Sequence, residues 1–320
     1  MIRTGLQIPS FSFPAPDAEL FGRLSAMARA AETSGFDSLY VMDHFYQLPM
    51  LGAPQERMLE AYTLLGGLAA ATEQIQLGTL VTGNTYRNPA LLAKIITTLD
   101  IVSSGRAILG IGAGWFELEH DAMGIEFGTF TDRFDKLEEA LAIILPMLDG
   151  KRPSLDGERY RVKDVINSPL PVRRPPLLIG GSGERKTLRI AAEHAQHMNL
   201  TSGRSEVAHK VEVLEGHLAT VGRDRSDIEV SMLGMLFLGA THEEAVAKRD
   251  ARLATAGMTW EQAEPLVGDR FFWGDPDEVT AQIAEVRDAG LDALIVNMVS
   301  DGDDTDAISL AGEVLSKAFT

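Results

Sequence analysis

The chain has 320 residues, of which 45% are hydrophobic and 23% charged, and 29 Lys and Arg against 46 Asp and Glu give a formal charge of −17. This composition is typical of a folded globular protein, and the acidic excess disfavours nucleic-acid and anionic-membrane partners. Cysteine is absent, which excludes thiolate chemistry, and no apolar leader or run of 18 apolar residues is found, so we expect a cytoplasmic protein.

Short apolar segments alternate with longer segments of helical period, a pattern typical of repeated βα units around a parallel sheet. The predicted strands are Gly5–Pro9, Ser38–Met42, Ile75–Thr82, Ala107–Gly112, Pro176–Gly180, Gln196–Leu200, Ile228–Leu238 and Ala293–Val299. The predicted helices include Ala18–Thr33, Tyr62–Ala71, Pro89–Val102, Thr131–Leu148, Lys186–Glu193, Ser205–Val221, His242–Ala256, Pro276–Ala289 and Thr305–Lys317. Eight such units predict an α/β fold, a (β/α)8 TIM barrel formed by residues 1–320 as one domain. The main alternative is an open doubly wound sheet, but no Gly-x-Gly-x-x-Gly follows the first strand.

Two segments interrupt the alternation of strands and helices. Gly150–Pro176, before strand five, has turn residues and alternating polar and apolar positions, which predict an inserted loop or hairpin. Gly257–Gly274, after strand seven, is rich in aromatic residues, and we expect this second insertion to cover the barrel mouth.

Catalytic groups of such barrels lie on the loops that follow the strands. Asp43 and His44 follow strand two, and a histidine there can hydrogen-bond a cofactor ring or transfer a proton near neutral pH. The structural alternative is that Asp43 caps the following turn and His44 satisfies a loop carbonyl. The place at a strand end favours a functional role.

Glycines mark two further strand ends. Gly110-Ile111-Gly112-Ala113-Gly114 follows strand four and allows a planar ring to approach the backbone, although a glycine-rich barrel corner is the structural alternative. Gly180-Gly181-Ser182-Gly183 leads into a predicted helix, where backbone N–H groups and the helix N-terminus can hold a phosphate. The alternative there is a turn with Ser182 as the helix N-cap.

One segment of this acidic chain is basic. Residues 151–189 hold ten Lys or Arg against four Asp or Glu, a net charge of +6, which leaves −23 on the rest of the chain. Such a segment can hold a polyanionic cofactor. It can equally be a solvated hairpin whose arginines pair with neighbouring acids.

Taken together, these segments resemble the bacterial-luciferase-like barrel superfamily, and within it the branch that uses the deazaflavin coenzyme F420. The resemblance runs through almost the whole chain. It is carried by Gly5-Leu6-Gln7-Ile8-Pro9, Ala31-Glu32-Thr33-Ser34-Gly35-Phe36-Asp37-Ser38, Met42-Asp43-His44-Phe45, Leu77-Gly78-Thr79-Leu80-Val81-Thr82, Arg87-Asn88-Pro89, Gly105-Arg106-Ala107-Ile108-Leu109-Gly110-Ile111-Gly112-Ala113-Gly114-Trp115, Leu178-Ile179-Gly180-Gly181 and Gly274-Asp275-Pro276-Asp277-Glu278-Val279.

The resemblance implies a site for coenzyme F420, with FMN as the alternative cofactor. His44 would lie beside the reactive edge of the ring, and Asp43 would contact the ring or its side chain. A non-proline cis peptide at Leu80–Val81 would press the backbone against the back of the ring. The remaining cofactor-binding residues that it implies are Thr82, Gly112, Ala113, Gly114, Gly180, Gly181, Ser182 and Gly183. Members of the family usually pair as homodimers.

The sequence departs from the family at one position. In the sugar-phosphate dehydrogenases of the family, a glutamate that donates a proton directly follows the strand-four glycines. Here that position is Trp115, and Glu117 lies two residues further on. The aromatic side chain argues against sugar-phosphate oxidation and favours a less polar substrate.

We therefore expect an F420-dependent oxidoreductase that transfers a hydride between F420 and a small organic substrate, with His44 as the catalytic residue. A reduced-FMN monooxygenase and a non-catalytic flavin- or deazaflavin-binding protein stay open as alternatives. A metal-dependent hydrolase is disfavoured, because the seven histidines form no His-x-His pair or His-Glu-x-x-His motif. We expect no metal site, and packed roles for His194 and His197.

Overall fold

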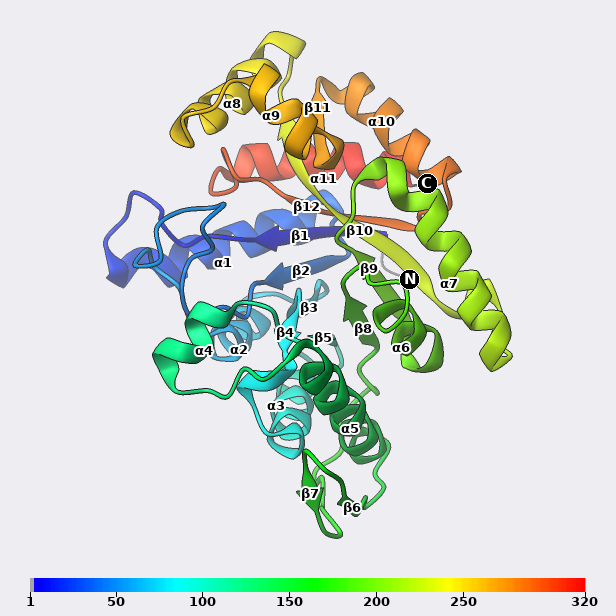
Figure 1. Ribbon diagram of the computed structural model, residues 1–320. Coiled ribbons are helices and arrows are strands. Elements are labelled where there is room, and N and C mark those ends of the chain that lie inside the picture. Colours follow the sequence, from blue (N-terminus) through cyan, green and yellow to red (C-terminus); the bar gives the residue numbers. More distant parts are fainter. Residues whose placement is uncertain (1–2, 320) are drawn as a thin grey trace.

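Eight parallel strands form a closed barrel in this computed structural model, which describes residues 3–319 (Figure 1). Around the barrel they follow the order β1, β2, β3, β5, β8, β9, β10 and β12, and β12 pairs with β1 to close it. Their bounds are Thr4–Ile8, Ser38–Val41, Gln76–Thr79, Ala107–Gly112, Leu177–Gly180, His197–Leu200, Glu229–Leu238 and Ala293–Asn297. The (β/α)8 fold and its eight predicted strands are confirmed. The third strand is interrupted at Leu80 and Val81, and Thr82–Gly83 continues it as β4 beside β5.

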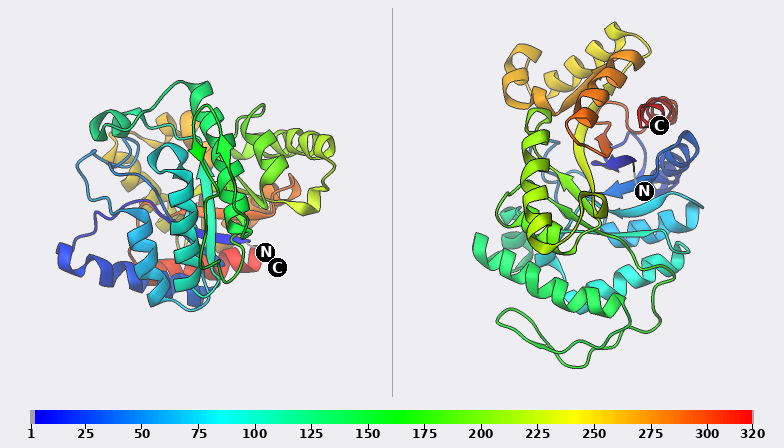
Figure 2. Two further views of the ribbon diagram at one scale, coloured as in Figure 1. Left: turned by 90° about the horizontal axis from the view of Figure 1, so that it is seen from below. Right: turned by 90° about the vertical axis from the view of Figure 1, so that its right-hand side faces the viewer.

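Helices surround the barrel on its outside (Figure 1). They are α1 (Asp17–Ser34), α2 (Ala61–Ala71), α3 (Pro89–Val102), α4 (Glu117–Met123), α5 (Phe130–Leu148), α6 (Thr187–His194), α7 (Val207–Val221), α8 (His242–Thr255), α9 (Trp260–Val267), α10 (Pro276–Asp288) and α11 (Thr305–Ala318). All nine predicted helices are found, whereas the short helices α4 and α9 were not predicted. The two ends of the described chain lie side by side (Figure 2), where the Arg3 guanidinium donates to the Phe319 carbonyl.

The apolar core has two layers. The larger layer lies between the strands and the surrounding helices, as expected for strands buried on both faces. A smaller layer fills the barrel interior with Tyr40, Ile108, Leu178 and Ile295. Leu80 and Val81 pack against this interior layer, so the barrel core supports the interruption of the third strand from below.

Both insertions are present, with different outcomes. The first contains the antiparallel hairpin of β6 (Leu155–Asp156) and β7 (Arg161–Val162), as predicted. The second forms α9 and a ninth parallel strand, β11 (Phe271–Gly274), which pairs with the outer part of β10. It packs with α8 around its own small apolar cluster and contributes Arg270 to the cavity described below. The second insertion therefore mainly extends the sheet beside β10. Of this segment, Arg270 lines the cavity, so the expected cover of the barrel mouth is wrong for most of it.

Candidate active site

A cavity of about 610 Å³ opens at the C-terminal ends of the barrel strands, where this fold places its active sites. Ten of the twelve predicted site residues line it. They come from four separate strand ends and are Asp43, His44, Leu80, Val81, Thr82, Gly112, Ala113, Gly114, Gly180 and Gly181. Segments far apart in the sequence therefore converge on one cavity.

Ser182 and Gly183 lie just beyond the cavity wall. The Ser182 hydroxyl accepts a hydrogen bond from the backbone N–H of Thr201 at 2.8 Å, and Thr201 does line the cavity. Helix α6 begins at Thr187, with Lys186 as a capping residue that forms no side-chain cap. The alternative role of Ser182 as the helix N-cap is therefore wrong.

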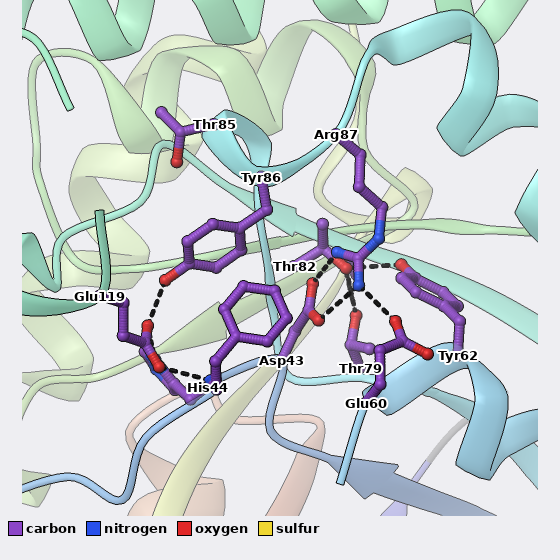
Figure 3. Close-up of polar contacts among 12 residues, drawn as sticks. Asp43, His44, Glu60, Tyr62, Thr79, Thr82, Thr85, Tyr86, Arg87 and Glu119 are labelled. Carbon is purple, nitrogen blue, oxygen red and sulfur yellow. Dashed lines mark hydrogen bonds and ion pairs between the residues drawn. The ribbon is translucent and has the colours of Figure 1, made fainter. Parts of the chain in front are cut away.

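Asp43 is fully buried and forms a two-pronged ion pair with Arg87. The guanidinium lies 2.5 Å and 2.9 Å from the two carboxylate oxygens and also contacts Glu60 at 2.6 Å (Figure 3). Burial raises the pKa of Asp43, although the charge of Arg87 acts in the opposite direction. The alternative of Asp43 as a turn cap is wrong, because its oxygens are occupied by Arg87. Sequence analysis included Arg87 in the resemblance but gave it no role.

His44 lies between a carboxylate and two aromatic rings. Its Nδ1 is 2.9 Å from Oε2 of Glu119, which comes from α4 (Figure 3). The rings of Trp115 and Phe116 meet its imidazole edge to face, each with centroids 5.7 Å away. Glu119 is a functional candidate that sequence analysis missed, because α4 was not predicted.

The peptide bond between Leu80 and Val81 is cis, as the resemblance implies. Val81 extends toward two neighbouring strands, and a Cβ added to Gly112 or Gly180 would lie only 3.1 Å or 2.9 Å from its methyl groups. The Leu80 carbonyl accepts a hydrogen bond of 2.8 Å from the Gln7 amide. Gly112 and Gly180 therefore leave space for the side chain of Val81. This supports the structural role of the glycines, a tightly packed barrel corner, over a role in admitting a planar ring.

Carboxamide side chains form part of the cavity wall. Gln7 and Asn297 face each other in register on β1 and β12, and both line the cavity. The side-chain oxygen of each is buried without a protein partner. Buried acceptors normally find a donor, so these two oxygens are suited to N–H groups of a ligand or to water.

The basic segment is largely neutralised by neighbouring acids, which supports the solvated hairpin over the cofactor site. Arg152, Arg159 and Arg174 pair with Asp164, Asp132 and Asp149, and further pairs are Arg161–Asp156, Arg189–Glu138 and Arg189–Glu193. The arginines that line the cavity, Arg133 and Arg270, lie outside this segment.

His197 is buried and bonds the Ser231 hydroxyl at 2.7 Å, a packed role as expected. Burial lowers its pKa to about 3. Within residues 3–319, no group of three or more His, Asp or Glu side chains is arranged to hold a metal ion. The helices of the same range include none that is long and apolar enough to span a membrane.

The loop after β2 is tied to the outer part of the molecule. Arg252 on α8 donates to the carbonyls of Met50 and Leu51, at 3.1 Å and 3.2 Å. Met50 and Leu51 line the cavity, and Met50 is 60% exposed at its rim. Trp115 and Phe130 are also exposed at the rim, at 55% and 60%. The entrance to the cavity is therefore mainly apolar, with Thr201 and Arg270 as the exposed polar residues of its lining.

A (β/α)8 barrel with a cavity at its strand ends, in which a histidine is bound to a carboxylate, has the fold and the site of a TIM-barrel enzyme. The model of one such family, the luciferase-like monooxygenases, matches residues 2–293. The chain belongs to this family, and the predicted family is confirmed.

Curated relatives and solved structures agree with this assignment. An F420-dependent glucose-6-phosphate dehydrogenase of Microbacterium testaceum is 31% identical over 83% of this chain and 84% of its own. A protein of the same name from Kineococcus radiotolerans is 30% identical over 86% of each chain. The fold matches that of the F420-dependent tetrahydromethanopterin reductase of Methanopyrus kandleri, with a TM-score of 0.80 at 20% identity, covering 100% of this chain and 99% of the other.

Proposed function

We propose that the protein is an F420-dependent oxidoreductase that transfers a hydride between F420 and a small organic substrate. The observation that carries the proposal is the convergence of His44, the Leu80–Val81 cis peptide and the glycine corner on one cavity, in a family whose curated relatives named above use F420. When bound, F420 supplies the two-electron hydride chemistry, and the protein supplies position and proton transfer.

The residues present fit such a cofactor. The buried oxygens of Gln7 and Asn297 offer acceptors to the N–H groups of a deazaflavin ring. Leu80, Val81 and Thr82 would support one face of the ring, and Gly112, Ala113 and Gly114 its flank. Asp43 would contact the ring or its side chain, and His44 would hold or move a proton beside the reactive edge. The phosphate would lie near Gly180, Gly181, Ser182 and Gly183, in the loop between β8 and α6.

We further propose a substrate that is less polar than a sugar phosphate. The rim of the cavity is mainly apolar, because three of its exposed residues are Met50, Trp115 and Phe130, and the exposed polar residues are Thr201 and Arg270. The guanidinium of Arg133, which also lines the cavity, donates to the carbonyls of Gly114 and Gly128, at 3.0 Å and 2.9 Å. An apolar rim favours enones, quinones or imines over glucose 6-phosphate, the substrate in the relatives' names.

Titration with F420 and with FMN tests the cofactor directly. Trp115 lies at the cavity and contacts His44, so its fluorescence should report binding in the cavity. We expect quenching by F420 at micromolar concentration. Tight FMN binding without a response to F420 would overturn the proposal in favour of a reduced-FMN monooxygenase.

Two assays test the reaction: oxidation of reduced F420 by a panel of enones, quinones and imines, and reduction of oxidised F420 by glucose 6-phosphate. We expect turnover with at least one apolar acceptor and none with the sugar phosphate in the reverse direction. If His44→Ala binds the cofactor and turns over at the wild-type rate, His44 has no role in the mechanism. If the wild-type protein binds the cofactor but turns over none of the compounds, a non-catalytic cofactor-binding protein is favoured. A homodimer and a cytoplasmic location stay predictions.

A further inference from the structure

Glu119 is a fully buried carboxylate that the proposed function has not yet used. It lies on α4 and reaches back to the loop after β2, 75 positions earlier in the chain. Four hydrogen-bonding groups surround it: the backbone N–H groups of Phe45 and Tyr46, the Tyr86 hydroxyl and Nδ1 of His44. A buried carboxylate with this many specific contacts fixes the geometry of its partners.

The contacts divide between the two oxygens of Glu119. Oε1 accepts from the two backbone N–H groups, at 2.8 Å from Tyr46 and closer still from Phe45. Oε2 accepts from the Tyr86 hydroxyl at 2.5 Å and faces Nδ1 of His44 at 2.9 Å. Burial alone would raise the pKa of Glu119, but the hydrogen bonds from His44, Tyr86 and Tyr46 hold it below its usual value. The carboxylate is therefore ionised and can only accept hydrogen bonds.

An acceptor at Nδ1 determines the tautomer of a neutral imidazole. Because the carboxylate has no proton to give, the hydrogen of His44 must lie on Nδ1, and Nε2 keeps its lone pair. Nε2 lies on the opposite edge of the ring from Glu119, and His44 lines the cavity.

We infer that Glu119 is a positioning residue that holds His44 as the Nδ1–H tautomer, with Nε2 presented to the cavity as the proton-accepting atom. The role in turnover rests on the proposed function, whereas the tautomer is a property of the ligand-free protein.

The neighbour of Glu119 fixes α4 in place. The ring of His120 bonds the Thr85 hydroxyl through Nε2 at 2.7 Å and the Phe116 carbonyl through Nδ1 at 2.8 Å. The helix is thus attached to the segment after β4 on one side and to its own first turn on the other. This attachment leaves the carboxylate little freedom to follow a rotation of the His44 ring.

Glu119→Gln gives a specific test, because the two oxygens of Glu119 have different partners. The backbone N–H groups of Phe45 and Tyr46 are donors, so in the Gln variant they can bond only the amide oxygen. This oxygen must therefore take the place of Oε1. The NH2 group then faces Nδ1 of His44 and donates to it. The imidazole must change to the Nε2–H tautomer, and the cavity loses its proton acceptor.

The experiment is long-range 1H–15N NMR of the histidine rings in ligand-free protein at alkaline pH, with His44→Gln to assign the signal. We expect the Nδ1–H tautomer in the wild type and the Nε2–H tautomer in Glu119→Gln. Glu117→Gln, which removes an exposed carboxylate from the same helix, should leave the wild-type signal unchanged. Tyr86→Phe keeps the carboxylate and should keep the Nδ1–H tautomer.

An Nε2–H tautomer in the wild type would overturn the inference, even if Glu119→Gln does not fold. So would an unchanged Nδ1–H signal in a folded Glu119→Gln protein. In turnover, we expect Glu119→Gln to lower kcat by about 10²- to 10⁴-fold with little change in KM, the range for loss of a proton-transfer group. Failure of F420 to bind would refute the proposed function but leave the tautomer result intact.

Discussion

The two sides of the cavity are built in different ways. The side after β2 is made of buried side chains with defined partners, namely the Asp43–Arg87 pair and the His44–Glu119 pair. The side after β8 is made of glycines and hydroxyl groups, and its clearest bond is the one from Thr201 to Ser182. The first side is preorganised by charged side chains that bind one another, whereas the second is formed mainly by backbone and small side chains. We therefore expect substitutions on the first side to affect stability and chemistry, and those on the second to affect mainly binding.

The largest effect is expected for Arg87→Ala, which leaves the buried Asp43 carboxylate without a partner. Removing one member of a buried pair costs about 3–5 kcal/mol of unfolding free energy. Arg23→Ala is the matched control, because it breaks a partly exposed pair with Asp303 and should cost about 1 kcal/mol or less. Urea unfolding measures both. Equal losses in the two variants would show that the buried Asp43–Arg87 pair contributes no more to stability than a partly exposed one.

Gly180→Ala should depart from this rule, because Val81 fills the space beside Gly180 on the side after β8. The new methyl group would lie 2.9 Å and 3.0 Å from the Val81 methyl groups, so we expect a loss of about 1–3 kcal/mol. Adding Val81→Ala to the Gly180→Ala protein should restore most of the lost unfolding free energy. Gly66→Ala, on α2 with no atom near its added Cβ, should instead stabilise by about 0.5–1 kcal/mol. A Gly180→Ala protein as stable as the wild type would show that Val81 moves aside freely.

Acid should weaken the contribution of Glu119. The pKa of Glu119 is lowered in the folded protein, so its stabilising effect is complete above the unfolded pKa of about 4.5 and is lost as pH falls through the folded value. The stability difference between wild type and Glu119→Gln should therefore be largest near pH 7 and shrink below about pH 4.5. Urea midpoints across this pH range measure the difference. A difference that grows on acidification would contradict the lowered pKa.

The smallest effect is expected for Ser182→Ala, which removes the bond to the Thr201 N–H on the side after β8. Ser182 is proposed to lie near the phosphate of F420, where one hydrogen bond contributes about 0.5–1.5 kcal/mol, so F420 should bind roughly three- to tenfold more weakly. The unfolding free energy should change by less than about 0.5 kcal/mol. Ser316→Ala, on α11 far along the chain, is the control. A large loss of stability in Ser182→Ala would place this residue with the preorganised side instead.

The same contrast explains what could be predicted from the sequence. The eight barrel strands are short apolar runs, and the glycines after strands four and five are local signals, so both were predicted. Glu119 was missed because its role depends on the packing of the short helix α4 against a loop 75 positions away. Its neighbours Trp115 and Glu117 are closer to the glycines after strand four, so the sequence analysis compared these two residues, and not Glu119, with the proton-donating glutamate of the family. The local sequence Phe116-Glu117-Leu118-Glu119-His120 carries no motif that identifies a buried carboxylate.

The basic segment and β11 show two other limits of prediction from sequence. Charge counts along 151–189 could not reveal that Asp132 and Glu138, on the preceding helix, would neutralise Arg159 and Arg189. The strand β11 has only four residues and lies next to aromatic side chains that suggested a cover. It became a strand because β10 extends beyond the barrel and offers an edge for pairing.

The contact between Val81 and two glycines, Gly112 and Gly180, restricts the order in which substitutions at these three positions can accumulate. A Cβ at position 112 or 180 lies only 3.1 Å or 2.9 Å from a Val81 methyl group, so a side chain there is favoured once residue 81 has become smaller. A lineage that widens or reshapes this wall should therefore substitute position 81 first. A mutant library that varies the three positions singly would reject combinations that are viable together.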